Sequence, residues 1–444
     1  RELQNESEAP DVFNGSDVVT MLFGIDGMRV RAQAEIVDEW WLKIETTAEL
    51  VGCSACGTRA VGHGRRPVRV RDLPVFGQPV VLLWAKRIWR CPDRDCETNT
   101  WTERHPAIRP RQVLTERARF EICRLVGADG WSVARAARSF GVGWHCAWAA
   151  VVDHGLPLID DPARTTGVAS LGVDETRFLS RTRNRSTVYV TGLVDLDRRL
   201  LLDVVVGRSG KVVTDWLEAQ PLEWRRFVSV AAIDAFRGYA TGIGACLDAE
   251  LVLDRFHVVR LANAAVDDVR RRTQQETLGH RGRKGDPLYG IRRLLLVAGE
   301  NLDTRGWDRL QRGLDDGDPW GEVGAALLAK ELLRAVFSAV DVAHARRRLG
   351  VFFQWCAEAE VPELFRLAHT IDRWSDELLA FHTTGGASNG PAEAVNLLIE
   401  NARRAGYGFR NFDNYRLRLL LACGIKWQTP PVARIRGRQP RSAA

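Results

Sequence analysis

Lysine, methionine and long apolar runs are scarce in this chain. Its 444 residues contain six lysines and two methionines, so 57 of the 63 basic side chains are arginines. No stretch of about 18 residues is both apolar and uncharged, and we therefore expect no membrane-spanning helix. The first residues, RELQNESEAPD, are polar and do not begin with methionine, so we expect no secretory signal there and the true start stays open.

Positive charge is abundant instead. The net charge is +7 and the isoelectric point is about 9.1. The planar guanidinium of arginine matches phosphate groups and the edge of guanine, so this balance favours a nucleic-acid partner. A genome-wide bias toward arginine would give the same composition and is the alternative. At this length we expect two to four domains rather than one core.

Four of the nine cysteines come in two close pairs, Cys53 with Cys56 and Cys91 with Cys96. An odd number of cysteines without a secretory signal favours a reducing compartment over a disulfide framework. Two thiolates presented by one tight turn are typical of structural zinc sites, and alternating apolar residues between the pairs predict short strands. We therefore predict a zinc ribbon with one structural Zn²⁺. Free buried cysteines are the alternative.

Basic side chains surround the predicted ribbon and suit contact with a nucleic-acid backbone. Arg65 and Arg66 are the DNA-binding candidates of this group. The whole group comprises Arg65, Arg66, Arg69, Arg71, Lys86, Arg87 and Arg90.

Three helices are predicted between residues 115 and 153. Thr115 and Ser132 are suitable N-caps for the first two, and Gly141 interrupts the chain before a third helical segment, WHCAWAAVVD. Small alanines on the second helix allow a close crossing, as in a helix-turn-helix whose recognition helix enters the major groove. An ordinary helical hairpin is the alternative. On the first interpretation the DNA-contacting candidates are Arg135, Arg138, Trp144 and His145.

Alternating apolar runs from residue 168 predict a β-sheet with acidic residues at its strand ends. The runs give three strands in a meander, then helix, strand, helix and strand. This is the order of an RNase H-like sheet, in which the first and fourth strands are neighbours. Asp174 and Asp234 would then project from the same end of two adjacent strands, where facing carboxylates favour a divalent cation. The alternative is that each aspartate is only a turn residue.

Mostly helical segments follow up to about residue 385, and a last helix begins within SNGPAEAVN. We expect Gly390 to be its N-cap and Pro391 its first helical residue. Glu393 is then either a capping-box glutamate at the third helical position or the third metal ligand. Glu400, two turns later, is the competing candidate for that ligand.

These segments together resemble the DDE transposases of bacterial insertion sequences, in particular the ISL3 family, over residues 21–427. The resemblance rests on the four ribbon cysteines and on LGVDETRF, AIDAFRGY, LDRFHVVR, SNGPAEAVN and YGFRNFDNYRLRLL. It implies an RNase H-like domain with a helical insertion. It further implies a catalytic triad of Asp174, Asp234 and Glu393 that binds two Mg²⁺ or Mn²⁺ ions, supported by Asp254 and His257.

The expected function is therefore that of an insertion-sequence transposase. Such a protein would bind terminal inverted repeats, hydrolyse a phosphodiester bond with two metal ions, and join the freed 3′-hydroxyl to target DNA. Double-stranded DNA is the expected partner, a homodimer or larger assembly is expected on it, and the location would be cytoplasmic and nucleoid-associated. Arg270, Arg271 and Arg272 would grip the DNA backbone. The alternatives are a DNA-binding regulator without catalysis and an RNase H-like nuclease without strand transfer.

The expected fold class is multidomain α+β, with a zinc ribbon, a helix-turn-helix and an RNase H-like α/β domain interrupted by an all-helical insertion. The expected boundaries are 1–20 for a disordered N-terminus, 21–108 for the zinc-ribbon domain, 109–165 for the helix-turn-helix and linker, 166–258 for the first part of the catalytic core, 259–385 for the insertion, 386–425 for the final helices of the core and 426–444 for a basic tail.

Overall fold

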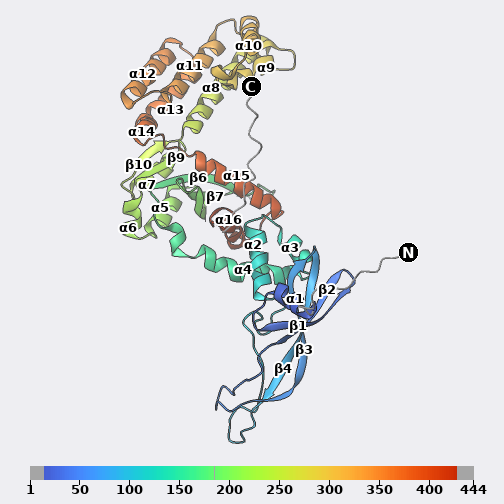
Figure 1. The fold of residues 1–444 in the computed structure, drawn as a ribbon. Coiled ribbons are helices and arrows are strands. Elements are labelled where there is room, and N and C mark those ends of the chain that lie inside the picture. Colours follow the sequence, from blue (N-terminus) through green and yellow to red (C-terminus); the bar gives the residue numbers. More distant parts are fainter. Residues whose placement is uncertain (1–14, 185, 428–444) are drawn as a thin grey trace, which may run out of the picture. The chain divides into compact units, whose positions relative to one another are not determined.

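The computed structural model describes residues 15–184 and 186–427 (Figure 1). The chain forms two compact units, residues 1–161 with 401–444 and residues 162–400. Residues 1–14 of the expected disordered N-terminus and residues 428–444 of the expected basic tail lie outside the described residues. The expected domain boundaries stay predictions. No helix in the described ranges is both long and apolar enough to cross a membrane.

A five-stranded sheet forms much of the first unit. Its strands pair in the order β1-β2-β4-β3, and β5 pairs with β4. The sheet has a buried face because apolar residues recur at alternate positions, and Val70, Leu82 and Trp84 are almost fully buried. The elements are α1 (Gly15–Phe23), β1 (Met28–Ile36), β2 (Glu39–Thr46), β3 (Val61–Val75), β4 (Gln78–Arg90) and β5 (Thr100–Thr102).

Four helices complete the first unit: α2 (Glu116–Gly127), α3 (Val133–Ser139), α4 (Trp144–Ile159) and α16 (Phe412–Cys423). The two predicted N-caps are confirmed, because the side chain of Thr115 accepts from the N–H of Ala118 and that of Ser132 accepts from the N–H of Arg135. Helix α16 packs on α2 and α4 within this unit, although its residues had been expected to complete the catalytic core.

A second five-stranded sheet lies in the second unit, with strand order β10-β9-β6-β7-β8. Strand β9 pairs in parallel with both β6 and β10, whereas β7 is antiparallel to β6 and β8. The prediction that the first and fourth strands are neighbours is confirmed. The elements are η1 (Pro162–Thr165), β6 (Ser170–Leu179), β7 (Val188–Asp195), β8 (Leu200–Val206), α5 (Gly210–Glu218), α6 (Leu222–Phe227), β9 (Val230–Ile233), α7 (Arg237–Gly244) and β10 (Glu250–Leu253).

Helices follow β10, as the sequence predicted. They are α8 (Arg255–Leu278), α9 (Pro287–Ile291), η2 (Leu294–Leu296), η3 (Gly299–Asn301), α10 (Thr304–Gly317), α11 (Glu322–Val336), α12 (Val342–Glu358), α13 (Pro362–Asp372), α14 (Ser375–Thr383) and α15 (Gly390–Ala405).

Two of these helical segments differ from the expectation. The run IRRLLLVAG is not a helix of its own, because α9 ends at Ile291 and only the short η2 follows. The run from Pro362 to Thr383 forms two helices rather than one. The break between them falls at Trp374, which is buried and has the guanidinium of Arg237 over its ring at 3.7 Å.

Candidate active site and metal centre

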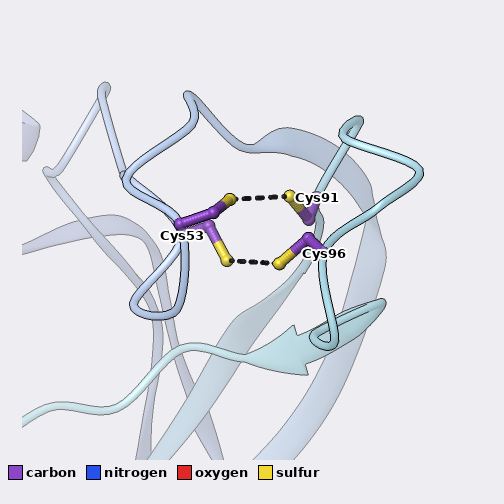
Figure 2. Close-up of side chains that lie close together, drawn as sticks. Cys53, Cys91 and Cys96 are labelled. Atoms are coloured by element: carbon purple, nitrogen blue, oxygen red, sulfur yellow. Dashed lines mark hydrogen bonds between the residues drawn. The ribbon is translucent and has the colours of Figure 1, made fainter.

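The four paired cysteines meet beside the β3–β4 hairpin, where Val61 pairs with Arg90 (Figure 2). The Sγ atoms of Cys53 and Cys96 lie 3.7 Å apart and those of Cys56 and Cys91 lie 3.5 Å apart. All four Sγ atoms lie within 4.8 Å of one another. Thiolates at about 2.3 Å from one tetrahedral Zn²⁺ are about 3.8 Å apart, whereas disulfide sulfurs are about 2.05 Å apart. The cluster therefore fits a structural zinc ion with four protein ligands.

The turn that carries the first cysteine pair is preorganised by its own backbone. The N–H of Cys53 donates to the carbonyl of Thr58 at 2.8 Å, and the N–H of Gly57 donates to the carbonyl of Cys53 at 2.8 Å. Hydrogen bonds from Thr58 also lower the pKa of Cys56 to about 7. Because the thiolate is the form that binds metal, this environment favours zinc binding at neutral pH.

Three aspartates lie at the same level of the second sheet. The parallel pairing of β9 with β6 and with β10 ends one residue before Asp174, Asp234 and Asp254. Neighbouring strands thus bring these carboxylates to one edge of the parallel part of the sheet. Asp174 lies inside β6 and not at its end as expected, because β6 continues along β7 after its pairing with β9 stops.

The side chain of Asp254 is buried and connects two helices to the sheet. Its Oδ2 accepts from the N–H of His257 at 3.0 Å, which caps α8. Its Oδ1 accepts from the N–H of Asn389 at 2.9 Å, immediately before α15. The side chain of Asn389 also donates to the carbonyl of Val173, next to Asp174. Asp254 therefore fixes where α15 starts relative to the strand edge.

This contact bears on the capping-box alternative for Glu393. Helix α15 begins at Gly390, so Asn389 and not Gly390 precedes it. A capping-box glutamate would accept from the N–H of that preceding residue, but the N–H of Asn389 is bound to Asp254 instead. The carboxylate of Glu393, in the first turn of α15, is therefore not required as a cap. Glu400 lies seven residues further on, about 10 Å along the helix.

The triad residues influence one another electrostatically. Burial, and then the charge of Asp234, raise the pKa of Asp174 to about 6. Burial, and then the charges of Asp254 and Asp234, also raise the pKa of Glu393. Two carboxyl groups with raised pKa values, one on β6 and one on α15, are ones that a nearby divalent cation would stabilise in the ionised form.

Neighbouring polar groups orient these carboxylates. The amide Nδ2 of Asn396 and the N–H of Glu175 donate to Asp174, which favours its ionised form. The Nδ1 atom of His257 lies 2.6 Å from Oδ2 of Asp234, and Nη2 of Arg260 lies 2.6 Å from Nε2 of the same imidazole. This network assigns the imidazole proton to Nδ1, facing Asp234.

The acidic site is wider than the cysteine cluster. In the part of the chain that the structure describes, only the four cysteines form a group whose ligand atoms all lie within 4.8 Å. Carboxylate oxygens are the ligands that Mg²⁺ and Mn²⁺ prefer. The chemistry of these residues therefore fits a divalent cation, and the number of ions stays a prediction.

The arginines and aromatic residues proposed to contact DNA fall into two groups. Arg65, Arg66, Arg135, Arg138, Trp144 and His145 are exposed on the first unit. Of these, Arg65 lies 3.4 Å from the carboxylate of Glu45 but keeps 60% of its side chain exposed.

The second group consists of Arg270, Arg271 and Arg272. The structure corrects the expectation that all three contact DNA. Arg270 is 3% exposed and its guanidinium donates to Asp267 and Gln274, so it is not available to DNA. Arg272 is bound to Glu322 and Glu363 on other helices. Arg270 is thus bound within α8 and Arg272 connects α8 to two other helices, whereas the side chain of Arg271 is half exposed.

Two known protein families match this chain. Residues 49–96 match the zinc-finger of the transposases of IS204, IS1001, IS1096 and IS1165, so the four cysteines belong to a zinc ribbon of that class. Residues 171–419 match the ISL3 family of DDE transposases, a family whose description is "Transposase". This match covers more than half of the chain, and the chain therefore belongs to the ISL3 family of DDE transposases.

Curated relatives agree with this family. The transposases for insertion sequence element IS1557 from two Mycobacterium tuberculosis strains, CDC 1551 / Oshkosh and H37Rv, are each 28% identical over 269 residues. The aligned region covers 56% of this chain and 58% of each relative. No solved structure matches.

Zinc content tests the cysteine cluster. We predict about one Zn²⁺ per purified chain and loss of nearly all of it in Cys91→Ser, because three thiolates leave the tetrahedral site incomplete. Cys146→Ser is the matched control, since Cys146 lies outside the cluster. Metal content is measured by mass spectrometry of elements after dialysis. A wild-type protein without zinc, or a Cys91→Ser protein that retains it, would show the interpretation to be wrong.

Thermal unfolding tests the charge at Asp174. Without bound metal, in EDTA, the pKa of Asp174 is 3.8 in the unfolded chain and about 6 in the folded chain. The folded state therefore binds more protons between these pH values, and the stability of the wild type should fall as the pH rises through them. At pH 7.5 we predict that Asp174→Asn is more stable by on the order of 1 kcal/mol. Millimolar Mg²⁺ should raise the unfolding midpoint of the wild type and leave that of the variant nearly unchanged.

Glu175→Gln is the control for this comparison, because the neighbouring Glu175 is exposed. It should behave like the wild type in EDTA and in Mg²⁺. Equal responses of Asp174→Asn and the wild type to Mg²⁺ would remove Asp174 from the metal site.

Proposed function

We propose that this chain is the transposase of an insertion sequence, which binds terminal inverted repeats, hydrolyses a phosphodiester bond at the ends of the element and joins the freed 3′-hydroxyl to target DNA. The observation that carries this proposal is the meeting of three acidic residues from distant parts of the sequence. Asp174 comes from β6, Asp234 from the end of β9 and Glu393 from the first turn of α15. The charge of Asp234 raises the pKa of both Asp174 and Glu393, which supports one shared site.

The strand order supports an RNase H-like catalytic domain. Strands β6, β7 and β8 form an antiparallel meander. On the other side of β6 the sheet continues through β9 and β10, which run parallel to β6. In this arrangement the site lies where β6 and β9 run side by side, and the helices α8 to α14 are inserted between β10 and α15 (Figure 1). We regard these helices as the insertion domain.

The chain's own contribution to catalysis would be to hold and orient the three carboxylates. Asp174, Asp234 and Glu393 would bind two Mg²⁺ or Mn²⁺ ions. When bound, such ions lower the pKa of a coordinated water and stabilise the leaving oxygen of the phosphodiester. Hydrogen bonds from Asn396 orient Asp174, and His257 orients Asp234. Because the carboxylates hold metal and do not attack phosphorus, no covalent protein–DNA intermediate is required.

We assign DNA recognition to the first unit. Helices α2, α3 and α4 would form a helix-turn-helix, with α4 as the recognition helix and Trp144 and His145 near the base edges. Exposed arginines of α3 and β3, including Arg135, Arg138, Arg65 and Arg66, would contact phosphates. Paired ends of one element require at least two active sites, so a homodimer on double-stranded DNA remains our expectation.

A strand-transfer assay tests the catalytic assignment. The substrates are pre-cleaved DNA carrying the terminal repeat and a supercoiled plasmid target, with Mg²⁺. We predict that Glu393→Gln lowers joining by at least about 100-fold, since a neutral amide is a poor ligand, while DNA binding is unchanged. Glu400→Gln, on the same helix, should join at close to the wild-type rate.

The assay also separates the rival functions. A regulator without catalysis would bind the repeat but neither nick nor join it. A nuclease without strand transfer would nick the DNA but never attach its 3′-hydroxyl to the plasmid. If Glu400→Gln loses joining while Glu393→Gln keeps it, our choice of the third ligand is wrong.

A further inference from the structure

A cavity of about 420 Å³ lies within the first unit and plays no part in the catalytic site. It is formed by the first turns of α3 and α4 together with the residues that lead into and begin α16. This size is that of a site for a small organic molecule rather than for a single ion. The residues that matter for its chemistry are Trp144, Trp148, Tyr407, Phe409, Arg410 and Arg418.

Aromatic rings supply flat apolar surface at this cavity. The rings of Trp144 and Trp148 are stacked, with centroids 5.8 Å apart and planes at 20°, and Trp144 is 45% exposed. Across the cavity Tyr407 is 91% exposed and has φ 54°. This left-handed conformation closes the C-terminus of α15, because the N–H of Tyr407 donates to the carbonyl of Arg404 at 3.0 Å. The turn therefore leaves the ring exposed beside the cavity.

Positive charge supplies the second feature of the cavity. Arg418 is 3% exposed, and its guanidinium donates to the carbonyl of Trp131, with both distances 3.2 Å. Among the described residues no carboxylate lies within ion-pair distance of it. Burial lowers the pKa of this guanidinium to about 10, which reflects the cost of a buried cation without an anion. A bound anion would remove that cost.

Two helices add to the positive potential. Helix α4 begins at Trp144, and the N-cap of α16 is Asn411, and both residues line the cavity. The positive ends of two helix dipoles therefore face the same space, and the exposed Arg410 lies beside them. The ligand must combine a flat aromatic face with negative charge, and a nucleotide has both.

We propose that this cavity binds one unpaired nucleotide of the bound DNA, with its base against Trp144, Trp148 and Tyr407 and its phosphate toward Arg418. The inference rests on the proposed DNA-binding function and adds a substrate feature to it. A paired base cannot present its face, so the nucleotide must be extrahelical, either flipped from the duplex or located in a single-stranded end. Stacking on aromatic rings tolerates any base, so the cavity would recognise the unpaired state and not the sequence.

Binding of two labelled duplexes tests this inference. The duplexes are identical except that one carries a single unpaired adenine, and fluorescence anisotropy is measured in EDTA so that catalysis plays no part. We expect the wild type to bind the bulged duplex about 10-fold more tightly. Tyr407→Ala should lose this preference and keep its affinity for the paired duplex.

A matched control is available in the same unit. Phe76 is 90% exposed and has φ 51°, so Phe76→Ala removes an equally exposed aromatic ring from an equally strained position outside the cavity. It should retain the preference. As a second readout, 2-aminopurine at the bulge should lose fluorescence when the wild type binds, because it stacks on tryptophan, and Trp148→Leu should weaken this loss.

The outcomes distinguish this inference from the proposed function. If the wild type binds both duplexes equally, or if Tyr407→Ala keeps the preference, the cavity does not bind an unpaired nucleotide although DNA binding stands. If the protein binds neither duplex, the inference and the proposed DNA-binding function both fail. The inference is supported if the preference for the bulged duplex is lost in Tyr407→Ala and kept in Phe76→Ala.

Discussion

The buried carboxylate of Asp254 is the contact on which the candidate active site depends. It accepts one hydrogen bond from the start of α8 and one from Asn389, 135 residues later in the sequence. The first contact places His257 beside Asp234, and the second sets the start of the helix that carries Glu393. Burying a carboxylate is costly unless donors satisfy it, and here two backbone N–H groups and the positive end of α8 do so.

The two metal sites of the chain are built in opposite ways. The zinc site arises from two local turns, and its thiols already have the spacing of ligands around one ion. The acidic site is assembled by tertiary contacts, and burial together with the charge of Asp234 raises the pKa values of Asp174 and Glu393. Bound zinc would stabilise the fold at the first site, whereas the raised pKa values at the second lower stability at neutral pH, and the divalent ions that we propose there would offset this cost.

Features set by residue spacing, cap chemistry and strand order were predictable, and those set by individual side-chain contacts between distant segments were not. The cysteine pairs, the caps at Thr115 and Ser132 and the pairing of β6 with β9 follow from spacing, cap chemistry and strand order. The sequence left Glu393 open between a cap and a metal ligand, because only the fold shows that Asp254 already binds the N–H in question. The burial of Arg270 was likewise hidden, since an arginine run predicts a solvated surface. The domain boundaries and the catalytic roles stay predictions.

The central claim is that Asp174, Asp234 and Glu393 bind divalent metal together. Anomalous diffraction from crystals soaked in Mn²⁺ tests it most directly, because the scattering of manganese locates the ion independently of any activity. The account predicts anomalous density within coordination distance of oxygens from all three side chains. Density bound by Asp174 and Asp234 with Glu393 turned away, or manganese bound only elsewhere, would contradict it.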